Sequence, residues 1–184
     1  MKATTVIGAA AALLGAYVAG DQLAAARTGL AEQQAAIHEA WLHLDAVLER
    51  RAALMPRLAE ALRHDALAGP ALAELSAGRD AFLAARSTRG RISANAAMET
   101  AVTRLHPLLE ERPGRLPNPV LISLRDDLTH SENEVAVERR KYNDAVQKYN
   151  TSIELFPNNV AASLFGFARD DAYFQTEPAK RDAP

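Results

Sequence analysis

The chain of 184 residues is long enough for one domain with short appendages, and its composition of 48% apolar but only 5% aromatic residues requires a core built mainly from Ala, Leu and Val. Ala and Leu favour helices, whereas the β-branched and aromatic residues that favour strands are sparse. A net charge of −2 gives no indication of a nucleic-acid-binding surface, and the absence of Cys excludes disulfides, thiolate metal sites and a Cys nucleophile.

The N-terminal segment resembles a membrane span. Residues 3–20 carry no charge, and a helix of this length spans roughly 27 Å, close to the hydrocarbon thickness of a bilayer. We therefore predict a transmembrane anchor over residues 3–21. Lys2 and the terminal amine face Asp21 and Arg27 across the membrane, so the positive-inside count is nearly balanced. We expect the N-terminus inside and the domain outside.

Two alternatives for this segment stay open. Cleavage of a signal peptide after Gly20 would release a secreted, soluble binding protein. A buried helix of a soluble domain also fits the pattern. Within an anchor, small residues at every fourth position let two helices approach closely, so a homo-oligomer is one expected assembly. These residues are Gly8, Ala12, Ala16 and Gly20.

The first long helix of the bundle is predicted over residues 22–64. Two apolar rows step by seven and together alternate three and four apart, which is typical of a coiled-coil or bundle seam. The rows are Leu23, Leu30, Ile37, Leu44 and Leu58, and Trp41, Leu48, Met55 and Leu62. Arg51 interrupts the first row, where its long stem covers apolar surface. Pro56 predicts a kink or a locally broken hydrogen bond, because proline has no N–H.

A second helix is predicted over residues 70–111, with a local break allowed at 87–90. Its apolar side consists of Leu72, Leu75, Phe82, Ile92, Met98, Val102 and Leu105. A proline-rich linker at 113–119 separates it from the third helix, over residues 120–156. Pro157 stops that helix, because the residue before a proline avoids helical geometry.

A short helix over residues 159–165 follows and ends at Gly166, which suits the left-handed residue after a helix. Together these elements predict an all-α fold: a long up-down-up antiparallel helical bundle over residues 22–175, with an N-terminal transmembrane helix and a short C-terminal helix at the tip. The first and third long helices would run parallel, placing the tip beside residues 64–70 and far from the membrane. Residues 176–184 are predicted to be a disordered tail.

A repeated Tyr-Asn pair is the most specific pattern in the third helix. Apolar and aromatic residues spaced four and three apart form one seam along this helix, and the simplest interpretation is that the seam lies in the core of the bundle. Its residues are Tyr142, Val146, Tyr149, Ile153 and Phe156. Asn143 and Asn150 lie at the seam's edge, where they would bond across to the neighbouring helix and fix its register, or contact a partner. The candidate register or partner-contact residues are Tyr142, Asn143, Tyr149, Asn150, Phe156, Pro157, Asn159, Phe165 and Phe167.

These residues also carry a family resemblance. The Tyr-Asn repeat, Phe156-Pro157, Asn159, Gly166-Phe167 and Tyr173-Phe174, with Ala40-Trp41, Arg50-Arg51 and Pro56 in the first helix, resemble in order and spacing the LemA family of bacterial membrane-anchored helical proteins. The chain departs from the family at 112–119, and has His64-Asp65 where relatives have His-Glu. The resemblance implies a single-pass protein of the bacterial inner membrane, with its bundle on the periplasmic side and a link to membrane protein quality control and zinc metalloproteases.

Catalytic patterns are weak. His38 and His43 are five apart rather than the four that a helical zinc-protease motif needs. Asp126, His130 and Glu134 are spaced four apart and form the alternative interpretation, a metal-dependent enzyme, although a solvated charged face explains them equally well. We predict a non-enzymatic envelope scaffold or interaction module without metal or cofactor, with the membrane and an envelope protein as partners.

Overall fold

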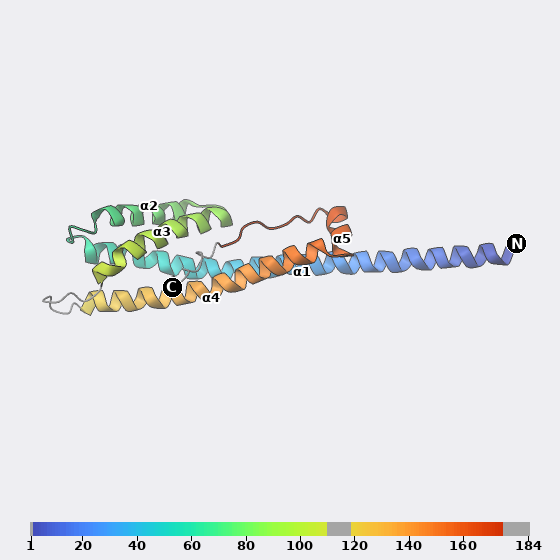
Figure 1. Ribbon diagram of the computed structural model, residues 1–184, viewed down its shortest axis with the longest axis horizontal. Helices are drawn as coiled ribbons and strands as arrows, with labels where there is room; N and C mark the ends of the chain where they lie inside the picture. The colour runs from blue at the N-terminus through green and yellow to red at the C-terminus, as the bar shows by residue number, and fades with distance from the viewer. Residues whose placement is uncertain (1, 110–118, 175–184) are drawn as a thin grey trace, which may run out of the picture. The chain divides into compact units, whose positions relative to one another are not determined.

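The computed structural model describes residues 2–109 and 119–174, with side chains from residue 14 onward in the first helix. Within these residues the chain forms five helices and no strand (Figure 1), so the predicted all-α class is confirmed. The helices are α1 (Lys2–Leu62), α2 (Gly69–Ala84), α3 (Thr88–Leu109), α4 (Pro119–Glu154) and α5 (Asn158–Phe165). The predicted tail at 176–184 and most of the linker at 113–119 lie outside the described residues.

The chain divides into two compact units. Unit 1 contains Met1–Glu39 and Asp144–Asp171, and unit 2 contains Ala40–Asn143 and Ala172–Pro184. Both α1 and α4 are single helices that contribute one part to each unit. Pro56 lies inside α1, whose hydrogen-bonded course continues to Leu62.

In unit 2, α4 runs antiparallel to α1. Arg50 Nη2 lies 3.4 Å from Glu134 Oε1, and further along α1 Arg57 Nη1 lies 3.1 Å from Asp127 Oδ2. Numbers therefore rise along α1 as they fall along α4, and Figure 1 shows successive helices of this unit alternating in direction. The prediction that the first and third long helices run parallel is wrong.

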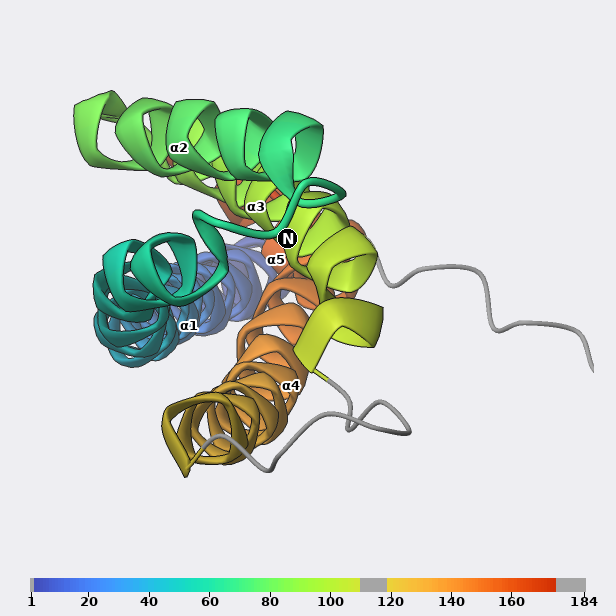
Figure 2. The same ribbon diagram turned by 90° about the vertical axis from the view of Figure 1, so that its left-hand side faces the viewer.

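α4 runs antiparallel to α1 because the chain reverses direction once more within the second predicted helix. The segment expected to be one helix over 70–111 is two helices, α2 and α3, which pack side by side (Figure 2). Ala85 adopts extended geometry with ψ of 130° and ends α2. Ser87 then starts α3, since its Oγ accepts the backbone N–H of Gly90 at 3.1 Å, a typical N-terminal cap. The extra helix returns the chain to the end of α1, so α4 must run back along it.

Most residues of the two heptad rows of α1 are buried as predicted, whereas Leu23 and Trp41 are half-buried. Leu30, Leu44, Leu48 and Leu58 are fully buried, and Met55 and Leu62 nearly so. Arg51 is also buried, at 1% exposure, with Nη2 3.9 Å from Glu132 Oε1 on α4. Its aliphatic stem thus occupies a core position, while its charge faces a carboxylate at the surface.

Arg91 on α3 connects the hairpin formed by α2 and α3 to α1. Its Nη1 donates to Asp45 Oδ1 at 2.6 Å and to Glu49 Oε1 at 2.8 Å, and its guanidinium carbon lies 4.9 Å from the ring centroid of Phe82. The hydrogen bonds to Glu49 and Asp45 raise the pKa of the guanidinium above its ordinary value. One charged side chain on α3 therefore contacts both α1 and α2.

In unit 1, α1 exposes apolar side chains near its N-terminal end. Leu14, Tyr17 and Val18 are 65%, 74% and 49% exposed. Among the described residues, no helix combines the length and the apolar character needed to cross a bilayer. The predicted anchor at 3–21 begins among residues 2–13, whose side chains lie outside the described part of the chain.

Gly78 provides a test of the α2–α3 contact. A Cβ added there would lie 3.1 Å from both Cγ and the backbone N of Met98, so the helices approach closely only because this residue lacks a side chain. We expect Gly78→Val to lower the free energy of unfolding by about 1–3 kcal/mol through overpacking. Urea denaturation followed by circular dichroism measures the change.

The matched control is Gly69→Val, because a Cβ at Gly69 meets nothing within 4 Å. An exposed substitution of this kind should change stability by only about 0.5 kcal/mol. Equal losses for the two variants would contradict the close approach of α2 and α3.

Candidate functional site

The predicted apolar seam of α4 is largely the buried face of that helix. Tyr142, Val146 and Tyr149 are at most 1% exposed and Ile153 is 7% exposed, which confirms these four positions as core. Phe156 is 82% exposed, so its assignment to the seam is wrong. The helix ends at Glu154, and Phe156 leaves the buried face because it lies beyond the last helical residue.

In unit 2, Tyr142 packs against the only tryptophan of the chain. The ring centroids of Trp41 and Tyr142 are 5.6 Å apart, with an interplanar angle of 63° in an edge-to-face arrangement. This contact places Trp41 level with Tyr142 along α4. The antiparallel direction of the pair, rather than the pattern of apolar residues, determines this level.

Asn143 holds the C-terminal segment of unit 2. Its Nδ2 donates to the carbonyl of Phe174 at 2.8 Å, and its Oδ1 accepts the backbone N–H of Phe174 at 2.9 Å. The side-chain amide thus pairs with the backbone of one residue as a neighbouring β-strand would. Phe174 is 4% exposed, so this pair also fixes a buried aromatic side chain.

Asn150 makes the same arrangement within unit 1. Its Nδ2 donates to the carbonyl of Asp170 at 2.7 Å, and its Oδ1 accepts the backbone N–H of Asp170 at 2.9 Å. Tyr149 lies beside this contact: its hydroxyl donates to the carbonyl of Ala168 at 2.8 Å and accepts from Gln34 Nε2 at 3.0 Å. We call each Asn–backbone pair an asparagine clamp.

The clamps change the interpretation of the Tyr-Asn repeat. Asn143 and Asn150 were expected to bond to a neighbouring helix or a partner; the hydrogen bonds described for both amides go instead to backbone groups of the segment after α5. Each clamp satisfies one N–H and one C=O of extended chain that would otherwise need water. Gln34 also belongs to the site, and the sequence offered no signal for it beyond a polar residue at helical spacing.

The corner between α4 and α5 lies in unit 1, beside the N-terminal part of α1. Arg27 places its guanidinium carbon 5.4 Å from the ring centroid of Phe165. The corner was expected beside residues 64–70; the contact that the structure describes for it is with Arg27 of α1, within unit 1. Phe167 and Pro157 are half-buried, and Asn159 is exposed.

Local interactions define this corner. Asn158 does not cap α5 but donates from Nδ2 to the carbonyl of Ser152, at 3.2 Å, and to its Oγ, at 2.8 Å. The Phe156–Pro157 peptide is cis. Gly166 takes the predicted left-handed conformation, with φ of 75°, and its N–H bonds to the carbonyl of Ala162 at 2.9 Å.

The candidate metal residues on α4 do not form a ligand set. Asp126 pairs with Arg125 at 3.4 Å, and Glu134 pairs with Arg50 across the helices. His130 is 78% exposed on its side chain, with Nε2 3.7 Å from Glu134 Oε1. Within residues 2–109 and 119–174, no three His, Asp or Glu side chains gather as metal ligands would. These residues behave as a solvated charged face.

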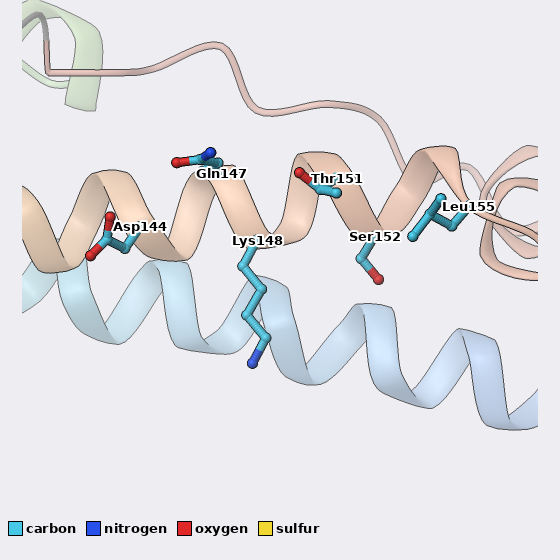
Figure 3. A pocket seen from close by; sticks show the side chains of 6 residues that line it. All are labelled: Asp144, Gln147, Lys148, Thr151, Ser152 and Leu155. Carbon is cyan, nitrogen blue, oxygen red and sulfur yellow. The ribbon is translucent and has the colours of Figure 1, made fainter.

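A shallow hollow lies on the surface of α4 in unit 1 (Figure 3). Five of its lining residues lie on α4, and the sixth follows the helix directly: Asp144, Gln147, Lys148, Thr151, Ser152 and Leu155. The one lining serine has an oxygen that accepts from both Asn158 Nδ2 and Gln33 Nε2, so it holds the fold together. No histidine is among these six residues.

The Asn150 clamp predicts the protease sensitivity of the segment that it holds. Asn150→Ala removes both hydrogen bonds to Asp170, which should cost about 1–3 kcal/mol of local stability. Trypsin cleavage after Arg169, measured by mass spectrometry under native conditions, should accelerate roughly tenfold, since each 1.4 kcal/mol changes the open population by that factor. Gln147→Ala, an exposed amide on the same helix, is the control; similar acceleration there would contradict the clamp.

The hydroxyl of Tyr149 predicts a pH effect. Burial raises its pKa above the ordinary value of about 10, as does the charge of Asp170, while the hydrogen bond from Gln34 opposes this. A raised folded-state pKa means that the contribution to stability is complete below pH about 10 and is lost as the pH rises through the folded pKa. The stability difference between the native chain and Tyr149→Phe should therefore shrink above pH 10 in urea denaturation; a constant difference would contradict a buried phenol.

A comparison with known protein families gives a match that covers most of the residues described above. A protein-family model, that of the LemA family, matches residues 40–184, which include the Tyr-Asn repeat, both clamps and α5. No curated protein matches the chain. Because the family match covers most of the sequence, and in agreement with the resemblance of its motifs, the chain belongs to the LemA family.

Proposed function

We propose that this protein is a non-enzymatic scaffold of the bacterial cell envelope, anchored in the inner membrane through residues 3–21, with its bundle on the periplasmic side. Helix α1 would serve both as the anchor and as the central helix of the bundle. A protein partner in the envelope would bind the bundle surface, and the link of related proteins to membrane protein quality control makes a component of that machinery the expected partner class.

The continuity of α1 is the observation that carries the proposal. One helix runs from Lys2 to Leu62, and its first part contains the charge-free run of residues 3–20. Leu14 and Tyr17, in the second half of that run, are largely exposed. Exposed apolar side chains on a helix that continues into a folded bundle are what a lipid environment would cover.

The use of the polar residues supports a scaffold rather than an enzyme. Asn143, Asn150 and the Tyr149 hydroxyl all bind backbone groups and hold the segment after α5. A catalytic group must instead be placed to reach a substrate. The Tyr-Asn repeat therefore has an architectural role in this proposal. The outer surface of the bundle would bind the partner.

A charge in the middle of the apolar run tests the anchor. Arg at the centre of a membrane helix costs about 2.5–3.5 kcal/mol on an insertion scale. A run rich in Ala and Gly has only a small favourable free energy of insertion to offset this cost. We expect Leu14→Arg to move much of the protein from the carbonate-resistant membrane fraction to the supernatant. Leu42→Arg, at a similarly exposed leucine of α1 that lies in unit 2, should stay in the membrane.

Two results would reject the anchor. One is recovery of the native chain in the supernatant after carbonate extraction. The other is an intact mass that lacks residues 1–20, which would show cleavage and favour the alternative, a secreted binding protein. A native-sized, carbonate-resistant protein that Leu14→Arg releases agrees only with the anchor.

A further inference from the structure

The corner between α4 and α5, defined here as residues 155–165, exposes an unusual number of apolar side chains. They are Leu155 (59% exposed), Phe156 (82%), Val160 (39%), Leu164 (64%) and Phe165 (48%). The sequence from Leu155 to Ala168 contains no charged residue. Several exposed apolar side chains within one short uncharged segment indicate a contact with a protein or a membrane.

The corner lies close to the predicted end of the membrane anchor. Arg27 of α1 contacts the ring of Phe165. Along the continuous helix, Arg27 follows Gly20 by seven residues, a rise of about 10 Å. Figure 1 shows α5 at the end of α4 that faces the N-terminal part of α1, in the same unit. An anchor that leaves the hydrocarbon at Gly20 therefore brings the corner to the depth of the lipid headgroups.

We propose that the α4–α5 corner is a second membrane contact, inserted into the boundary between headgroups and acyl chains of the bilayer that holds the anchor. This inference rests on the proposed anchor. Phe156, Leu164 and Phe165 supply the aromatic and aliphatic groups that partition into this boundary. The exposed guanidinium of Arg27 is at the depth of the lipid phosphates, where a cation is attracted by anionic lipids.

The position of the corner favours lipid over a second copy of the chain as the occupant. A bilayer entered by α1 is present at this depth in every molecule, whereas a second copy must be recruited. Residues 155–165 themselves include no charged side chain that would oppose burial among acyl chains. Contact at two points would restrict the tilt of α1 and hold the Asn150 clamp, on the same helix end, near the membrane.

Fluorescence quenching in bilayers tests this arrangement on the full-length chain. The native protein has no cysteine, so single-cysteine variants can carry an environment-sensitive nitrobenzoxadiazole dye at chosen positions. Leu164→Cys and Phe156→Cys report on the corner, and Tyr17→Cys reports on the anchor. Leu83→Cys, an exposed leucine of α2, is the matched control. Each is reconstituted in nanodiscs of phosphatidylcholine and phosphatidylglycerol, with or without lipids brominated near the headgroup end of the acyl chain.

The expected result is loss of dye emission in brominated lipid at the two corner positions and at Tyr17, with no loss at Leu83. Quenching at Tyr17 without quenching at either corner position would overturn the second contact and leave the anchor intact. A blue-shifted but unquenched dye at the corner would identify a protein surface as the occupant and also overturn it. No quenching at Tyr17 would remove the anchor itself, and the inference with it.

Discussion

The antiparallel packing of α4 on α1 is the constraint on which the other features depend. In unit 2 it aligns Arg50 with Glu134 and brings Trp41 against Tyr142, and in unit 1 it brings Gln34 to the hydroxyl of Tyr149. Direction follows from the number of reversals between the two helices, and the α2–α3 hairpin supplies one more than a three-helix bundle would. The α4–α5 corner consequently lies beside the N-terminal part of α1.

The asparagine clamps show how a helix can hold an extended segment without a sheet. A primary amide has one acceptor and two donors, so a single Asn can satisfy both backbone groups of one residue. Asn143 does this for Phe174 and Asn150 for Asp170. Binding through backbone atoms places no demand on the side chains of the held segment.

Several parts of the fold follow from short-range rules. The heptad rows identified the buried face of α1, and steps of three and four identified Tyr142, Val146, Tyr149 and Ile153 on α4, because periodicity reports which face of a helix avoids water. Gly166 was predicted at the left-handed position that it occupies, since a glycine has no Cβ to clash there. The break at Ala85–Ser87 was less visible: alanine favours helices, and only the Ser87 cap indicates a new start.

The sequence by itself determined the all-α class, the apolar faces, the end of α4 near Phe156-Pro157 and membership of the LemA family, because these depend on residue type and on spacing within one helix. The tertiary structure decided the direction of α4, the partners of Asn143 and Asn150, and the exposure of Phe156. These features depend on which distant segments meet. One additional turn between α2 and α3 reverses the direction of α4 along α1 and so changes which segments meet. The sequence allowed a local break at 87–90, but whether the chain reverses there depends on the packing of α2 against α3.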